Sequence, residues 1–251
     1  MRVLILLPPS ESKAVRARGA ALRPETLSAP ALAPQRERVA AALAQVSAGP
    51  EAMEVLGVGA SLTEEVARNT RLATAPTLPA RELYTGVLYD ALDLTTLDPA
   101  SARRATRRLR VVSALYGLVR MSDRLAPYRL SMGVNLPGVG PLATAWRPHL
   151  EQVLPEDAGH GLVVDCRSST YAAAWTPTGE LARRWVTVRV PGASHMAKHT
   201  RGLVARVLCE EPSDPRRPEA LMPLLADRFD GVELYEPARP GRPWVLDVPP
   251  A

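Results

Sequence analysis

Three short apolar segments, each followed by a cluster of polar residues, constrain the fold of this chain more than any other feature. Val3 to Leu7 is continuously apolar and stops at Pro8 and Pro9. Residues 162–165 are mostly apolar, and residues 185–190 alternate between apolar and polar. Short apolar runs of this kind are typical of strands buried in a parallel or mixed sheet. We therefore expect an α/β fold in which a central mixed sheet is flanked by helices.

The segments between these runs carry helix signals. Residues 35–47 have apolar positions at helical spacing, and Ser61 opens a Ser-Leu-Thr-Glu capping-box pattern that predicts a helix through Val66. Residues 97–115 form the most basic helix candidate, with Asp98-Pro99 as its N-cap and first helical position. Helices are thus predicted between the first and second of the apolar segments.

The chain reads as one domain over residues 1–251. It has 251 residues, with no repeat at a period of 20 to 50 residues and no Gly/Ser-rich linker. Near its end, residues 232–236 and 244–248 are joined by a proline-rich turn, and we expect two edge strands there.

Composition and the N-terminus favour a cytoplasmic protein. No apolar run approaches the roughly 18 residues of a membrane span, so we expect no membrane partner. The apolar stretch at the N-terminus is too short for a secretory signal. Cys166 and Cys209 cannot build a disulfide framework, and we expect reduced thiols. The oligomeric state is left open.

The cationic residues are divided unevenly. The formal net charge is +5, and of 31 cationic side chains only Lys13 and Lys198 are lysines, which leaves 29 arginines. An ammonium differs from a guanidinium because it is a compact charge whose pKa burial can lower. Because arginine has replaced lysine almost everywhere else, the two remaining lysines indicate positions that need amine chemistry; the alternative is that two such residues remain by chance.

Polar residues follow each of the three predicted strands. In α/β sheets, ligands bind outside the carboxyl ends of the strands, where loops and helix N-termini meet. If the strands are neighbours, one pocket would be lined by Ser10, Glu11, Lys13, Asp165, Arg167, Ser168, Ser169, Tyr171, Ser194, His195, Lys198 and Arg201. The alternative is that these residues are helix caps and surface charges on separate loops.

Such a pocket would suit an enzyme acting on a small anionic substrate that carries phosphate or carboxylate. Lys13 or Lys198 could act as nucleophile, His195 could move a proton, and Glu11 or Asp165 could orient them. Binding of the substrate would fall to Ser10, Arg167, Ser168, Ser169, Tyr171, Ser194 and Arg201. No nucleotide fingerprint or metal-ligand spacing is present, so we expect neither cofactor nor metal.

Five segments, in order, resemble the YaaA-like peroxide stress proteins. They are Leu-Leu-Pro-Pro-Ser-Glu-Ser-Lys at 6–13, Glu-Leu-Tyr-Thr-Gly-Val-Leu-Tyr at 82–89, the run 109–133, Asp-Cys-Arg-Ser-Ser-Thr-Tyr at 165–171, and Ser-His-Met-Ala-Lys-His-Thr-Arg-Gly at 194–202. The resemblance is colinear from residue 1 to about residue 209. It implies a cytoplasmic protein of the hydrogen peroxide response that limits free iron and damage to DNA.

The resemblance also implies a mixed α/β fold of the family's own type that binds DNA through a basic cleft and a helix-hairpin-helix element. Here that element would be a helix at 106–115, a turn at 116–118 and a short helix at 122–126. Eight arginines lie between residues 103 and 129. The residues we assign to nucleic acid are Arg103, Arg107, Arg110, Gly117, Arg120 and Arg129.

Two observations keep a plainer reading of this segment open. Helix-hairpin-helix turns usually carry two glycines, and only Gly117 is present. Leu109, Val112 and Leu115 could equally be the buried stripe of a solvated basic helix. The sequence therefore leaves DNA binding and small-molecule catalysis as two hypotheses.

Overall fold

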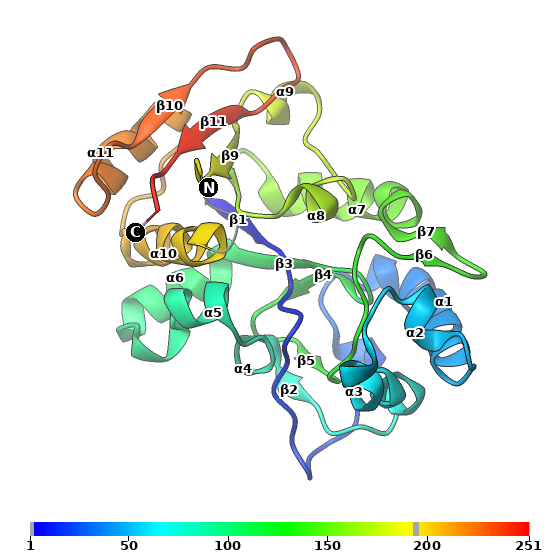
Figure 1. Ribbon diagram of the computed structural model, residues 1–251. Helices are drawn as coiled ribbons and strands as arrows, with labels where there is room; N and C mark the ends of the chain where they lie inside the picture. The colour runs from blue at the N-terminus through cyan, green and yellow to red at the C-terminus, as the bar shows by residue number, and fades with distance from the viewer. Residues whose placement is uncertain (1–2, 193–195, 251) are drawn as a thin grey trace.

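A seven-stranded mixed sheet forms the centre of the protein (Figure 1). The computed structural model describes residues 3–192 and 196–250. The strands of the sheet are β1 (Leu4–Leu7), β3 (Leu109–Ser113), β4 (Gly117–Arg120), β8 (Val163–Asp165), β9 (Trp185–Arg189), β10 (Glu233–Tyr235) and β11 (Trp244–Asp247). Their order is β10-β11-β9-β8-β1-β3-β4. The predicted α/β class is confirmed, and the three strands inferred from sequence are neighbours.

The pairing explains why the apolar runs are continuous. Strands β11, β9, β8, β1 and β3 are mutually parallel, whereas β10 and β4 join the two edges antiparallel. Every residue of β1, β3 and β8 is buried. Central strands of a parallel sheet are covered on both faces, so they lack a polar side.

Eleven α-helices surround the sheet within the described residues. They are α1 (Ala33–Ser47), α2 (Ala52–Val55), α3 (Thr63–Arg68), α4 (Ala80–Leu83), α5 (Val87–Leu92), α6 (Pro99–Arg108), α7 (Leu142–Ala158), α8 (Ser169–Ala172), α9 (Gly179–Ala182), α10 (Met196–Glu210) and α11 (Leu221–Ala226). Two small pairs add β2 (Leu78–Pro79) with β5 (Arg124–Leu125), and β6 (Asn135–Leu136) with β7 (Gly140–Pro141). None of these helices is long and apolar enough to cross a membrane.

Two of the helix signals in the sequence are confirmed by the structure, and one is wrong. Helix α1 covers the predicted segment 35–47, and the Asp98 carboxylate caps α6 by accepting from the Ala100 and Ser101 amides. Helix α3 begins at Thr63 without a side-chain cap, so the capping box predicted at Ser61 is wrong. A short 3-10 turn occupies residues 60–62 instead.

The predicted basic helix over 97–115 is wrong beyond Arg108. Helix α6 ends there, and the next five residues form β3, which pairs with β1 inside the sheet. Tertiary pairing on both sides of a β-branched, fully buried segment outweighs the local helical pattern. The cationic side chains at 107, 108 and 110 concealed the change from helix to strand.

The helix-hairpin-helix prediction is also wrong at the residues to which it was assigned. Residues 109–120 form an antiparallel β-hairpin, and Arg124–Leu125 belongs to strand β5. Gly117 sits in this hairpin with φ +66°, and a Cβ there would lie 2.6 Å from the Trp146 ring. Backbone conformation and close packing therefore account for this glycine.

The two C-terminal strands differ from the prediction in one respect. β10 is an edge strand, as expected, but β11 lies inside the sheet between β10 and β9. The chain returns parallel to β9 after α10 and α11, which gives β11 a partner on each side.

Helix α10 lies unusually close to α5, and glycine permits it. A Cβ at Gly202 would collide with the carbonyl oxygen of Leu88 and with Ala91. Because the two helices meet there, the first turns of α10 lie beside the segment that begins α5. This packing places Lys198 and Arg201 at the carboxyl edge of the sheet.

Candidate functional site

A pocket of about 460 Å³ lies at the carboxyl ends of β1 and β8. β1 is the switch point of the sheet, because the chain leaves it for β3 on one side and later returns as β8 on the other. Open α/β sheets bind ligands at such points. The pocket is lined by residues 8–12 after β1, residues 86–89 at the start of α5, Ser131, four residues between 166 and 171 after β8, and Lys198 and Arg201 of α10.

The loop after β1 is fixed against residues 83–89. The Ser10 hydroxyl donates to the Thr85 carbonyl, and the Tyr89 hydroxyl donates to the Pro8 carbonyl at 2.7 Å. The Ala14 amide donates to the Leu83 carbonyl at 2.9 Å. Two of the recognised sequence segments, 6–13 and 82–89, therefore lie against each other at the pocket.

A buried ion pair fixes the loop after β8. Arg167 Nε and Nη2 donate to the two oxygens of Asp165 at 2.8 and 2.7 Å, and Trp185 Nε1 donates to the same carboxylate at 3.2 Å. Arg167 also donates to the carbonyls of Tyr171 and Trp175. The guanidinium and the carboxylate thus face into the protein beneath the pocket.

The structure brings together half of the twelve residues predicted for the pocket. Ser10, Glu11, Ser168, Tyr171, Lys198 and Arg201 line it directly. Lys13 lines an adjoining pocket, and Asp165 and Arg167 are buried below. Ser169 is exposed at the start of α8 and is not in the lining. Ser194 and His195 lie outside the described residues.

Lys13 occupies the adjoining pocket of about 220 Å³, which shares Ser10, Glu11, Ser131 and Tyr171 with the larger one. Its Nζ donates to the Ser10 carbonyl at 2.6 Å and to the Glu11 carbonyl at 3.3 Å. The same atom lies 4.2 Å from the centroid of the Tyr128 ring.

This environment disfavours the charged ammonium form of Lys13 relative to the neutral amine. Burial, and then the nearby Arg129, lower the Lys13 pKa to about 7, while Glu11 and Glu65 act in the opposite direction. A large fraction of Lys13 is therefore a neutral amine near neutral pH. Neutral amines are nucleophiles and proton acceptors, which ordinary surface lysines are not.

A buried tyrosine network beneath Lys13 was missed from the sequence. The Tyr128 hydroxyl lies 2.7 Å from Ser113 Oγ and 3.3 Å from the Tyr84 hydroxyl. Burial raises the pKa of both phenols, so they remain protonated in the physiological range. Tyr84 and Tyr128 lie in segments that carry the family resemblance, but their spacing in the chain gave no sign that they meet.

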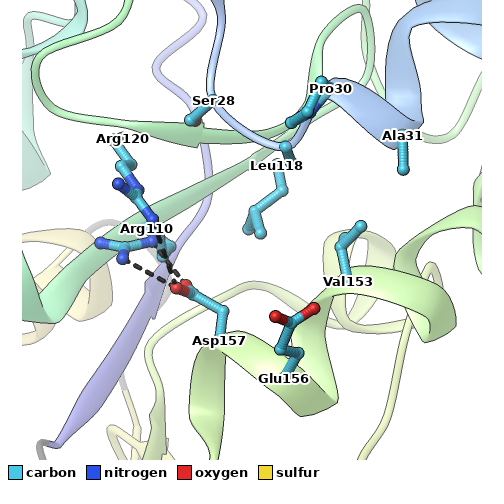
Figure 2. A pocket seen from close by; sticks show the side chains of 10 residues that line it. Ser28, Pro30, Ala31, Arg110, Leu118, Arg120, Val153, Glu156 and Asp157 are labelled. Atoms are coloured by element: carbon cyan, nitrogen blue, oxygen red, sulfur yellow. Dashed lines mark hydrogen bonds and ion pairs between the residues drawn. The ribbon is translucent and has the colours of Figure 1, made fainter.

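The residues assigned to nucleic acid are dispersed. Arg110 is buried, with Nε 2.6 Å from Asp157 Oδ2, and Arg120 approaches the same carboxylate at 3.8 Å (Figure 2). These residues line a second cavity, separate from the pocket at the ends of β1 and β8, and Glu156 is also part of its lining. Arg129 pairs with Glu11 at 3.1 Å, next to the Lys13 pocket. Carboxylates beside these guanidiniums oppose the approach of a phosphate.

The arginines of α6 lie far from the pocket. Arg104 donates to the Cys209 and Glu210 carbonyls, and Arg108 donates to the Glu211 carbonyl at 2.7 Å, so both cap the C-terminal end of α10. Helix α10 rises about 16 Å between Lys198 and Cys209 at 1.5 Å per residue. Arg103 and Arg107 are exposed on α6.

Comparison with known proteins identifies the family of the chain. The family model described as "Peroxide stress protein YaaA" matches residues 3–231. The chain belongs to the peroxide stress protein YaaA family, UPF0246. A UPF0246 protein of Streptomyces coelicolor is 52% identical over 98% of both chains. One of Corynebacterium efficiens is 40% identical, over 84% of this chain and 87% of its own. In this YaaA-family member, the recognised segments at 6–13, 82–89 and 165–171 contribute to the pocket walls or lie directly beneath them.

The Lys13 environment predicts a pH-dependent stability difference. Because its pKa is lowered in the folded state, the folded protein binds fewer protons than the unfolded chain between about pH 7 and pH 10. The contribution of Lys13 to the free energy of unfolding therefore rises there by about 1.4 kcal/mol per pH unit. Lys13→Met should be more stable than the wild type below pH 7, and this advantage should shrink as pH rises, as measured by urea unfolding.

Lys13→Arg is the matched control, because a guanidinium stays charged throughout this range. Its stability should lack the rise that the wild type shows between pH 7 and pH 10. If the difference in the free energy of unfolding between the wild type and Lys13→Met stayed constant over that range, the Lys13 pKa would not be lowered and the prediction would be contradicted.

Proposed function

We propose that this YaaA-family peroxide stress protein is an enzyme that acts on a small anionic substrate in the pocket at the ends of β1 and β8. Lys198 and Arg201 hold the anion, and Lys13 is the reactive amine. The observation that carries the proposal is the convergence of these cations from two separate segments on two adjoining pockets.

The larger pocket is suited to an anion. The Arg201 Nε donates to the Val188 carbonyl at 3.2 Å, which fixes the side chain at the pocket wall. Lys198 is exposed on the first turn of α10, where the partial positive charge of the helix adds to its own. Among the described lining residues Glu11 is the only acid, and Arg129 pairs with it.

Part of the pocket lining is apolar and suits the carbon skeleton of a small molecule. Pro8, Pro9, Val87, Leu88 and Tyr89 supply apolar surface. Hydroxyls of Ser10, Ser12, Ser168 and Thr170 add polar contacts around the rim. A pocket of about 460 Å³ with apolar walls and a few convergent polar groups has the character of a small-molecule site.

Anion binding should be visible as thermal stabilisation. In a screen of inorganic phosphate, pyrophosphate, phosphorylated metabolites and small carboxylic acids, a ligand at about 100 times its Kd should raise Tm by about 5 °C or more. Lys198→Ala combined with Arg201→Ala should abolish the shift, because the anion then lacks both partners.

Arg103→Ala is the matched control, since it removes an exposed cation from the surface of α6. It should leave the shift unchanged. The proposal would be contradicted if no anion stabilised the wild type, or if Arg103→Ala reduced the shift as much as the double variant does.

DNA binding is the second candidate, and one observation favours it. Arg103 and Arg107 are exposed on the same helix in a protein of net charge +5. Phosphate contacts of this kind give binding without base recognition, and they weaken steeply with salt. On this reading the contact surface is α6 rather than a helix-hairpin-helix.

Fluorescence anisotropy with duplex DNA at low and raised salt tests this candidate. Replacing Arg103 and Arg107 by alanine should weaken binding and reduce the salt slope by roughly 0.9 for each lost phosphate contact. Arg183→Ala, at an exposed arginine directly after α9, is the control for net charge. If both variants lost DNA affinity equally, the binding would reflect non-specific attraction to the positively charged protein and not a contact surface on α6.

A further inference from the structure

The Lys13 nitrogen is held in place by two backbone carbonyls and lies against the Tyr128 ring. A neutral amine has two N–H donors and one lone pair, and Nζ already donates to the carbonyls of Ser10 and Glu11. Both N–H groups are thereby held by backbone acceptors. When both N–H groups of a neutral amine are engaged in this way, its lone pair is the group that can attack carbon.

The shape of the paired pockets limits what can approach this nitrogen. The Lys13 pocket and the larger one share Ser10, Glu11, Ser131 and Tyr171, so the two pockets adjoin, and a ligand that uses both must reach past these shared residues. Lys198 and Arg201 stand in the larger pocket. A ligand anchored there by an anionic group would present its other end to Lys13.

We propose that Lys13 forms an imine with an aldehyde or ketone whose other end carries a phosphate or carboxylate held by Lys198 and Arg201. This inference rests on the proposed function and adds the class of substrate, namely anionic carbonyl compounds. The larger pocket selects substrates that carry an anionic group, and the Lys13 pocket selects those that also carry a reactive carbonyl.

The step balances without a further reactant. The Nζ lone pair forms a bond to the carbonyl carbon and the C=O π pair moves to oxygen; nitrogen then gives up one proton and the oxygen takes one up, which yields the neutral carbinolamine. The hydroxyl takes up a proton and leaves as water, the nitrogen lone pair forms C=N, and nitrogen gives up its second proton. Glu11, which lines both pockets, is placed to exchange these protons with solvent.

The surroundings of Lys13 suit this chemistry. Tyr84 and Tyr128 remain protonated, so they add no negative charge that would hold the lysine as ammonium. Cys166 lines the larger pocket, but burial raises the pKa of its thiol to about 12, so it stays a weak nucleophile. Lysine is therefore the stronger nucleophile of the two.

Reductive trapping tests the inference directly, because the chain contains only two lysines. The full-length protein is treated with pyridoxal 5′-phosphate and cyanoborohydride at neutral pH, and the adducts are assigned by peptide mass mapping. Pyridoxal, which lacks the phosphate, is the matched probe. We expect Lys13 as the main adduct, formed at least about tenfold faster with the phosphorylated probe, as one charge-assisted contact would give.

The variants separate the contributions of the two pockets. Lys13→Arg should remove the adduct, and Lys198→Ala with Arg201→Ala should reduce the rate with pyridoxal 5′-phosphate to that with pyridoxal. A cooperative unfolding transition in urea, whatever its midpoint, confirms that each variant is folded. The inference is overturned if the exposed Lys198 takes most of the label, or if both probes react with Lys13 at the same rate.

A failure of this inference can be told apart from a failure of the proposed function. If anions still stabilise the protein through Lys198 and Arg201 but no Lys13 adduct forms, the imine is excluded and the anion pocket stands. If neither the stabilisation nor the adduct is found, both ideas fall.

Discussion

The buried pair of Asp165 and Arg167 is the interaction on which the site depends. It connects the last residue of β8 to the loop that follows, and it leaves both charges almost completely removed from solvent. Removing one partner of such a pair leaves an uncompensated buried charge, at a typical cost of about 3 to 5 kcal/mol. The pair therefore fixes the chain where it turns from the sheet toward Ser168 and Tyr171.

Arginine has several distinct duties in this protein, and most are structural. Arg36 donates to the carbonyls of Tyr116 and Leu118 and so covers the open edge of β4. Arg104 and Arg108 satisfy carbonyls at the end of α10. A guanidinium presents five donors in a planar fork, which makes it suited to binding several carbonyls at once. A high arginine count is therefore compatible with few cations free to meet a polyanion.

The sequence predicted those strands whose apolar run ends abruptly in a cluster of polar residues. β1, β8 and β9 were recoverable because an apolar run followed by polar residues has one common meaning in an α/β protein. β3 was not, because an arginine-rich helix runs into it without a break and its pairing with β1 and β4 is what defines it as a strand. Local pattern cannot show a pairing that closes over about a hundred residues.

The same limit explains the outcome for the site. Ser10, Lys198 and Arg201 were found because each follows a recognisable strand, whereas Tyr84 and Tyr128 meet beneath Lys13 through packing alone. Arg167 was expected to face a ligand, but nothing local distinguishes a guanidinium that binds substrate from one that holds a loop. Burial decided that question, and burial is a property of the whole fold.

The account rests on an anion being held at the carboxyl edge of the sheet, and a crystal soaked in selenate would show where the protein places one. The selenium anomalous signal is predicted between Lys198 and Arg201, with Lys13 nearby in the adjoining pocket. A signal confined to the outer surface of α6, near Arg103 and Arg107, would contradict the account and favour a protein that meets phosphate on its exterior.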